Sequence, residues 1–145
     1  MSNNPFGITE RKARQSDYRF FRDLVKNSLF HYIIQYGPFN FRYLRESFRR
    51  TKEDIRILMR GKRRIGLYQL TPKGASLEIT RIFLAPSYRG KGIGTWYLRH
   101  FENLGYSRLT LQVWENNPAR HIYKNLGYKT IAIKDHKLHM EKLIK

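Results

Sequence analysis

The sequence predicts a mixed α/β (α+β) fold, with a central sheet of about six to seven strands and four helices. Apolar residues recur at helical spacing in much of the first 50 residues and alternate as in strands from residue 55 onward. A glycine-rich loop at residues 89–94 then separates a strand from a helix. The strand–helix–strand succession that follows is typical of a parallel crossover, which we expect at the centre of the sheet.

The first 50 residues predict one strand and two helices. Residues 8–13 form a short opening strand. Ser16-Asp17 supplies an N-cap for a long helix, and Gly37-Pro38 ends that helix. Asn40 is expected to cap a second helix.

The middle of the chain predicts three strands. Segments 55–59 and 65–70 flank Gly61-Lys62, which indicates a hairpin. Thr71-Pro72-Lys73-Gly74 combines strong turn formers, so we expect a turn there. A longer strand at residues 77–84 follows it.

The last third predicts two helices and three strands. The helices, at residues 93–104 and 118–126, are each followed by a glycine, which is a common signal at a helix C-terminus. The strands are expected at residues 109–114, 130–133 and 138–143.

Charge is the most unusual bulk property of the chain. Its 145 residues carry 29 Lys and Arg against 11 Asp and Glu, a formal net charge of +18. The excess is spread along the sequence, because 16 basic and 6 acidic residues lie in positions 1–65, and 13 and 5 lie in the rest. Such a surface attracts polyanions, including a phosphorylated cofactor, nucleic acid or an acidic protein face, and repels cationic substrates such as polyamines.

Composition excludes several classes of protein. Cysteine is absent, which rules out disulfides, a thiolate zinc site and covalent cysteine chemistry. The start, Met1-Ser2-Asn3-Asn4-Pro5, lacks the basic and apolar regions of a signal peptide. No apolar run approaches the roughly 20 residues that span a bilayer. We therefore expect a cytoplasmic protein with no membrane partner.

The loop Arg89-Gly90-Lys91-Gly92-Ile93-Gly94 has the features of a phosphate site. Glycines at alternate positions let backbone N–H groups turn inward and let a ligand approach without Cβ atoms in the way. The N-terminus of the next helix adds unsatisfied donors and a partial positive charge. Because Arg89 and Lys91 add two full charges, the predicted ligand is a phosphate or pyrophosphate.

Two nucleotide-binding motifs do not fit this loop. A Walker A loop needs Lys and then Ser or Thr after its last glycine, whereas Thr95-Trp96 follow Gly94. The dinucleotide fingerprint needs two residues between its last two glycines, and only Ile93 stands there.

Two blocks of residues carry a resemblance to a known family. Arg89, Gly92 and Gly94 match the pattern Arg/Gln-x-x-Gly-x-Gly/Ala, and residues 82–88 resemble the strand and β-bulge region that precede it. The second block matches Asn-x-x-Ala-x-x-x-Tyr-x-x-x-Gly-Phe/Tyr through Asn116, Ala119, Tyr123, Gly127 and Tyr128. Both patterns are those of the GNAT N-acetyltransferase superfamily, in which the first is the coenzyme A pyrophosphate loop. The resemblance is specific over residues 77–128.

This resemblance implies one GNAT domain over residues 1–145, in which a splayed pair of parallel strands holds the co-substrate acetyl-CoA. The pantetheine arm would pair with the backbone of Ile82 and Leu84, and an N–H of one of them would stabilise the oxyanion. The implied activity is acetyl transfer to a primary amine by direct attack in a ternary complex, without a metal. The residues expected to contact the cofactor are Ile82, Phe83, Leu84, Arg89, Gly90, Lys91, Gly92, Ile93, Gly94, Thr95, Asn116, Ala119 and Tyr123.

Tyr123 is the first candidate catalytic residue. It lies four residues after Ala119 on one helical face, which would point its hydroxyl toward the sulfur of the cofactor. An ordinary tyrosine has a pKa of about 10, so it is protonated at neutral pH and can act as a general acid. The alternative is a packing aromatic. Asn116 is expected to bond the pantetheine or to cap the helix of Tyr123.

Glu78 is the second candidate, as the general base. It stands where many relatives carry such a glutamate, although others carry it where Thr80 stands here. Strict alternation would place Glu78, Thr80, Ile82 and Leu84 on one face of the strand. The alternative is an ion pair of Glu78 with Arg81 or Lys73.

The remaining candidate residues border the acceptor. The aromatic segment 30–41 and the first two helices are expected to wall the acceptor site, with Tyr36 and Phe39 as its first candidates. His136 and His139 would face opposite sides of a strand, which makes them a poor metal pair.

Two other functions stay open on the sequence. One is a nucleic-acid- or ribosome-associated acetyltransferase or binding module, suggested by the charge of +18. The other is a GNAT domain that binds acyl-CoA without turnover. The sequence does not name the acceptor amine, and it is compatible with a monomer or a homodimer.

Overall fold

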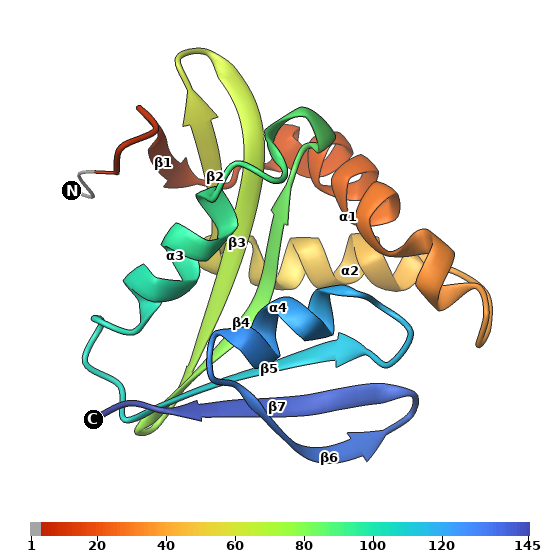
Figure 1. The fold of residues 1–145 in the computed structure, drawn as a ribbon. Coiled ribbons are helices and arrows are strands. Elements are labelled where there is room, and N and C mark those ends of the chain that lie inside the picture. The colour runs from red at the N-terminus through yellow and green to blue at the C-terminus, as the bar shows by residue number, and fades with distance from the viewer. Residues whose placement is uncertain (1–3) are drawn as a thin grey trace.

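The fold is a seven-stranded sheet with four α-helices. The computed structural model describes residues 4–145, and the strand order is β1-β2-β3-β4-β5-β7-β6 (Figure 1). The strands are β1 (Thr9–Lys12), β2 (Ile55–Arg60), β3 (Arg63–Lys73), β4 (Ser76–Leu84), β5 (Arg108–Trp114), β6 (Lys129–Lys134) and β7 (Lys137–Leu143). The helices are α1 (Tyr18–Ile33), α2 (Phe41–Thr51), α3 (Ile93–Phe101) and α4 (Ala119–Asn125), with short 3-10 helices η1 (Gln15–Asp17), η2 (Lys52–Asp54) and η3 (Pro86–Tyr88).

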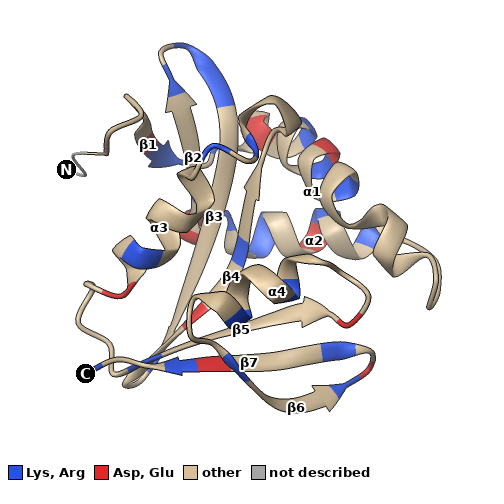
Figure 2. Ribbon diagram, in the orientation of Figure 1, with Lys and Arg blue, Asp and Glu red and all other residues tan. Residues whose placement is uncertain are grey.

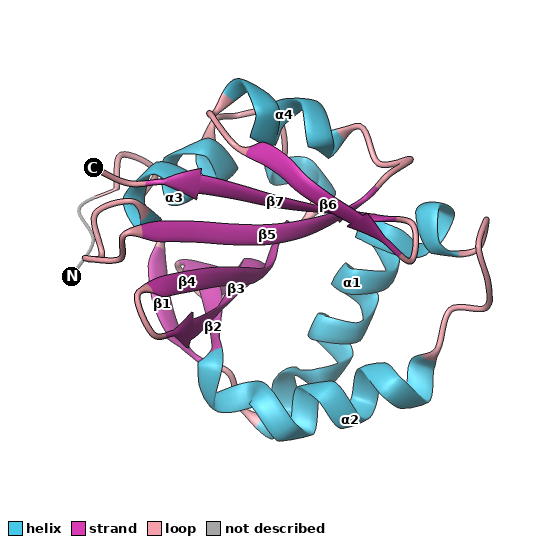
Figure 3. Cartoon of the chain, turned by 90° about the horizontal axis from the view of Figure 1, so that it is seen from below, coloured by secondary structure: helices cyan, strands magenta, loops and turns pink. Residues whose placement is uncertain are grey.

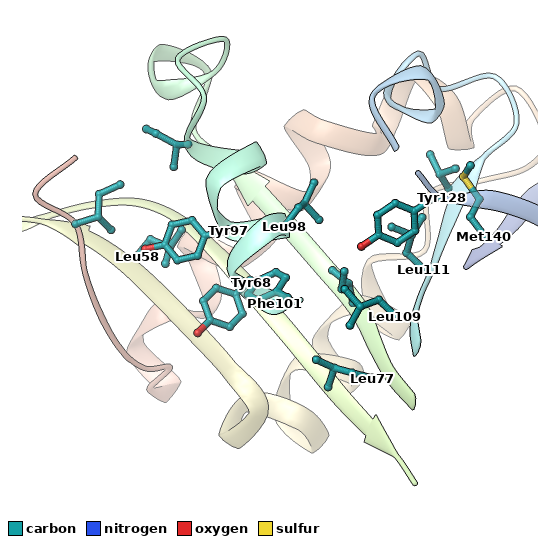
Figure 4. Close-up of a cluster of buried hydrophobic side chains, with 14 of the residues drawn as sticks. Leu58, Tyr68, Leu77, Tyr97, Leu98, Phe101, Leu109, Leu111, Tyr128 and Met140 are labelled. Atoms are coloured by element: carbon teal, nitrogen blue, oxygen red, sulfur yellow. The ribbon is translucent and has the colours of Figure 1, made fainter. Parts of the chain in front are cut away.

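The helices cover the two faces of the sheet in pairs. Figure 3 shows α1 and α2 on one face and α3 and α4 on the other. Each face has its own apolar core. The larger core joins α3 to the middle of the sheet and includes Tyr97, Leu98 and Phe101 (Figure 4). The smaller core joins α1 and α2 to the sheet and consists of Ala13, Phe21, Leu24, Val25, Leu44, Phe48, Ile55, Ile57 and Leu67.

The parallel pair β4–β5 is the crossover that the sequence predicts, and it splays. Its register runs from Ser76 opposite Arg108 to Ile79 opposite Leu111 and stops there. Both strands continue beyond that point, to Leu84 and to Trp114. All other strand pairs in the described chain are antiparallel. The predicted mixed sheet, its four helices and the splayed parallel pair are therefore confirmed.

The turn predicted at residues 71–74 lies only at the end of that range, and its first three residues are still strand. β3 continues to Lys73, and Pro72 pairs with Leu77 of β4. β2 pairs with β3 only as far as Gln69, so the outer part of β3 has no partner on that side. A proline is tolerated there because it lacks only an N–H that a central strand would need. The turn forms instead at Gly74, which has a φ of +63°.

Helix starts follow the sequence signals in part. Asn40 caps α2 as predicted, since its Oδ1 accepts a 2.9 Å hydrogen bond from the N–H of Tyr43. Asp17 precedes α1 but makes no capping bond to it. Its carboxylate accepts bonds from the N–H of Arg14 and from the guanidinium groups of Arg11 and Arg64. Asp17, which the sequence predicts as a helix cap, is therefore the centre of a group of buried ion pairs.

The positive charge belongs to the whole fold. Every α-helix and every strand of the described chain carries at least one Lys or Arg, and Figure 2 shows them on all sides of the ribbon. Within residues 4–145 no helix is long and apolar enough to cross a membrane.

Candidate active site

A cleft of about 490 Å³ opens where β4 and β5 splay apart, on the side of α1 and α2. Its walls come from α1, α2, β4, β5, α4 and β7 and from the α1–α2 and β5–α4 connections. The lining residues are Val25, Leu29, Ile33, Pro38, Phe39, Asn40, Tyr43, Leu44, Glu78, Ile79, Thr80, Arg81, Ile82, Phe83, Leu111, Gln112, Val113, Trp114, Asn117, Tyr123 and Lys137.

A β-bulge in β4 decides which residues face this cleft. Leu70 pairs with Ile79, but its neighbour Gln69 pairs with Arg81, so Thr80 is the extra residue. The bulge reverses the alternation, because two residues of one strand oppose one of the other. Ile82 therefore packs with the α3 core, as Ile79 does.

The predicted face of Glu78, Thr80, Ile82 and Leu84 is consequently wrong. Ile82 and Leu84 pack against the α3 core, whereas Phe83 packs against the α1–α2 core. Glu78 and Arg81 lie on the cleft side. A bulge depends on the register with the neighbouring strand, which the period of one strand does not reveal.

Glu78 lies in the wall of the cleft, and its carboxylate is paired. Its Oε1 is 3.1 Å from the Nζ of Lys73, and the side chains are 16% and 61% exposed respectively. The ion pair with Lys73 that the sequence left open is present, and the glutamate still faces the cleft.

Tyr123 of α4, on the other face of the sheet, also lines the cleft. Its ring packs edge-on against Tyr128 at a centroid distance of 6.0 Å. Burial raises the pKa of Tyr123 above the ordinary value, so its hydroxyl holds its proton throughout the neutral range. A protonated phenol in a cleft wall can donate a proton or a hydrogen bond.

The glycine loop has the backbone geometry of an anion cradle. Gly90 and Gly92 have φ values of +71° and +86°, and Gly92 is the N-cap of α3. The first bond of the helix is from the N–H of Trp96 to the Gly92 carbonyl, so the N–H groups of Gly94 and Thr95 have no acceptor inside the helix. A Cβ built on Gly92 meets no heavy atom within 4 Å. The left-handed backbone at residues 90 and 92, with the open helix terminus, fits a pyrophosphate.

The two cations of the loop lie differently. Lys91 is exposed within the loop. Arg89 bonds back onto the protein: its Nε donates to the Leu84 carbonyl, and its Nη2 donates to Asn27 and Ser28 of α1. Through these hydrogen bonds Arg89 connects the end of β4 to α1.

Asn117 takes one of the two roles that the sequence suggests for Asn116. Asn117, not Asn116, supports the start of α4, by accepting a 2.9 Å bond from the N–H of Ala119. The Nδ2 of Asn116 donates to the Tyr32 carbonyl of α1, and its buried Oδ1 has no partner among the described residues. Asn116 therefore offers a buried acceptor near the splayed strands.

The structure also shows where the aromatic candidates and His136 lie relative to the cleft. Phe39 lines the cleft, whereas Tyr36 stacks between Trp114 and His136 at centroid distances of 5.6 and 4.0 Å. His136 is not in a strand as predicted but in the β6–β7 turn, with a φ of +66°. Residues 4–145 hold no group of three or more His, Cys, Asp or Glu that could bind a metal.

Sequence reasoning missed Arg81, Trp114, Asn117 and Lys137 in the cleft wall. It also missed Gly66, where a Cβ would lie 2.6 Å from the carbonyl oxygen of Phe83 in β4. A signal for Arg81 was present, because it interrupts the apolar residues of a central strand. No local signal marks the others.

Comparison with known proteins identifies the family. The family model described as an acetyltransferase (GNAT) domain matches residues 52–130, more than half of the chain. The chain belongs to the GNAT acetyltransferases. The matched segment contains the splayed strands, the glycine loop and α4. No curated protein matches the sequence.

Solved GNAT structures share the whole fold at low sequence identity. The PaiA N-acetyltransferase of Thermoplasma acidophilum, in complex with coenzyme A, is 20% identical over 94% of this chain and 98% of its own, with a TM-score of 0.71. The spermidine N-acetyltransferase of Vibrio cholerae, in complex with CoA and spermine, is 22% identical over 95% and 96%, with a TM-score of 0.69. The N-acetylglutamate synthase of Neisseria gonorrhoeae, complexed with coenzyme A and N-acetyl-glutamate, is 16% identical over 99% of this chain and 36% of its own, with a TM-score of 0.75. The same fold thus occurs in proteins named for a polyamine and for an amino acid.

Proposed function

We propose that this GNAT protein is an acetyl-CoA-dependent N-acetyltransferase, acting as one domain over residues 1–145, that acetylates a primary amine in a ternary complex. The observation that carries the proposal is the opening of the β4–β5 pair beyond Ile79 and Leu111 into a cleft that both Glu78 and Tyr123 line. A glycine loop with positive φ at Gly90 and Gly92 follows β4 after the short helix η3.

The cofactor would lie along the splayed strands. The N–H groups of Gly92 to Thr95 would bind the pyrophosphate, with Lys91 beside them. The backbone of Ile82 and Leu84 would pair with the pantetheine. The unpartnered Oδ1 of Asn116 would accept a bond from a pantetheine amide, which satisfies a buried group that otherwise costs free energy.

Bound acetyl-CoA would supply an activated acetyl group, as a thioester. An amine nitrogen forms a bond to the acetyl carbon while the carbon–sulfur bond breaks, and the electron pair of that bond goes to sulfur. Tyr123 would donate its hydroxyl proton to the sulfur, since its raised pKa keeps it protonated. Glu78, directly or through water, would accept the proton that the amine loses, and water would restore the tyrosine.

The test has two stages. Calorimetry should first detect acetyl-CoA binding with a 1:1 ratio. A panel of primary amines is then tested for release of free CoA with a thiol reagent; the protein has no cysteine, so the reagent reports only CoA. Absence of acetyl-CoA binding would overturn the proposal. Tight binding with no transfer to any amine, peptide or protein amine would instead indicate a domain that binds acyl-CoA without turnover.

A further inference from the structure

One side chain in the cleft wall is a cation without a counter-ion. Arg81 lies on β4 beside Ile82 and lines the cleft. Its Nη1 donates a 2.5 Å bond to Gln69 Oε1, its Nη2 donates a 3.1 Å bond to Ser47 Oγ, and its guanidinium stacks over the ring of Phe21. Over residues 4–145, no carboxylate lies within ion-pair distance of it.

The partners of Arg81 form a built site. Gln69 and Ser47 are 3% and 4% exposed, and with Asp17 they are the buried polar side chains of the described chain. A guanidinium carries five N–H donors, two of which are used here, so three remain. Burying a charge without a partner costs free energy, as the lowered pKa of Arg81, caused first by its burial, also indicates. A bound anion would offset that cost.

The net charge of the residues that line the cleft is positive, like that of Arg81. Its charged lining residues, among those described, are Glu78, Arg81 and Lys137. Lys73 pairs with Glu78, whereas Lys137 lies over the Trp114 ring at 4.9 Å and has no acidic partner within residues 4–145. Two cations are thus left without an anion. A polycation such as a polyamine would meet repulsion here, although a relative with this fold is a spermidine N-acetyltransferase.

We propose that the acceptor amine carries its own anionic group, a carboxylate or a phosphate, and that Arg81 is the receptor for that group. The proposal rests on the acetyltransferase function above and names its substrate class. The planar guanidinium can bind a carboxylate or phosphate through two N–H groups at once, which gives both affinity and orientation. Gln69 and Ser47 hold the guanidinium, and Arg81 in turn orients the amine toward the splayed strands.

The experiment compares matched amines in the thiol-release assay. One arm pairs glycine and β-alanine with glycinamide and β-alaninamide. The other pairs O-phosphoethanolamine with ethanolamine, which distinguishes a phosphate from a carboxylate. We expect the anionic member of at least one pair to have the higher kcat/KM. A preference for the neutral members, or for spermidine, would overturn the inference while leaving the acetyltransferase function intact.

Arg81→Gln tests the receptor itself. The variant should lower kcat/KM for the anionic amine roughly 10- to 100-fold and change that for its neutral partner less than about twofold. Loss of packing alone would lower both equally and leave the ratio unchanged, which would contradict the proposal. Arg49→Gln is the matched control, because it removes one charge from the exposed side of α2, outside the cleft, and should keep the ratio.

Two further measurements keep the test decisive. If Arg81→Gln does not fold, Arg81→Lys is tested instead, because it keeps the charge but loses the planar pair of N–H donors. It should still reduce the ratio of kcat/KM for the anionic amine to that for its neutral partner several-fold. Calorimetric titration of the preferred amine into the CoA-saturated protein should show that the Arg81 variant binds this amine more weakly than the parent does. If acetyl-CoA does not bind at all, the proposed function and this inference both fail.

Discussion

On the α3–α4 face of the sheet the larger core holds no buried charged side chain among the described residues, and the glycine loop beside it is one contiguous segment. On the α1–α2 face the core is smaller and is interrupted by two charged centres: Asp17 with its arginines, and Arg81 with neutral partners. The contrast separates two kinds of binding. In the proposed function, the backbone of a short motif would hold acetyl-CoA, whereas the acceptor would meet side chains that distant segments bring together.

The largest effect should come from the residue that links the two faces. Tyr123→Phe removes only the hydroxyl, so we expect kcat to fall roughly 10- to 1000-fold, with acetyl-CoA affinity nearly unchanged. Steady-state kinetics with a verified acceptor measures this.

Tyr128→Phe is the matched control for that change. Its ring is buried against Tyr123, its hydroxyl has no partner in the described chain, and it does not line the cleft. The control should keep kcat. If Tyr123→Phe also keeps kcat, Tyr123 is a packing residue and water supplies the proton.

Gly92→Val should weaken acetyl-CoA binding roughly 10- to 100-fold. A β-branched residue is strained at a φ of +86°, and its side chain would stand where backbone N–H groups meet the pyrophosphate. Gly61→Val introduces similar strain at a φ of +60° in the remote β2–β3 turn, so it should reduce stability but not affinity. Equal acetyl-CoA affinity in folded Gly92→Val, measured by calorimetry, would remove the loop from the site.

Asp17→Asn should reduce the free energy of unfolding by about 2 kcal/mol at neutral pH. Burial raises the pKa of Asp17, but hydrogen bonds from Arg11, the N–H of Arg14 and Arg64 outweigh it and lower the pKa to about 2. A depressed carboxyl pKa stabilises the fold above the unfolded value of about 4, and that stability is lost as the pH falls from about 4 to 2. Urea unfolding across this range should show the loss in the parent and not in the variant.

Asp23→Asn is the control for the Asp17 substitution. Asp23 is 61% exposed and pairs only with its neighbour Arg22, so its loss should change the free energy of unfolding by less than about 1 kcal/mol. If the two variants unfold alike, the buried centre at Asp17 does not support the α1–α2 face.

The smallest effect is expected at the cap of α2. Asn40→Ala removes the bond to the N–H of Tyr43 and should cost about 1 kcal/mol of stability. Acetyl-CoA affinity should stay the same, since Asn40 lies on the acceptor side of the sheet. Asn40→Ser retains a capping oxygen and should recover most of the lost stability in the same thermal unfolding measurement. A matching loss of cofactor affinity would show that the two faces are not independent.

The sequence by itself determined the order of strands and helices, the mixed sheet, the glycine loop and the family. These features rest on local properties: apolar periodicity along one element, caps such as Asn40, and glycines where the backbone needs a positive φ, as at Gly92. The sequence also placed Tyr123 and Glu78 in the two segments that line the cleft. The sequence-based prediction was inaccurate where one residue is compatible with two structures. Pro72 is typical of a turn, but here it continues a strand that has no neighbour on one side.

Only the tertiary structure decided which residues face the acceptor. The bulge at Thr80 exists in the register between β3 and β4, and it places Arg81 on the α1–α2 side of the sheet and Ile82 against the α3 core. Arg81 meets Ser47, 34 positions earlier, and Asp17 meets Arg64, 47 positions later. The free energy of a buried charge depends on the partners that distant segments bring to it, and no periodicity along one strand contains that information.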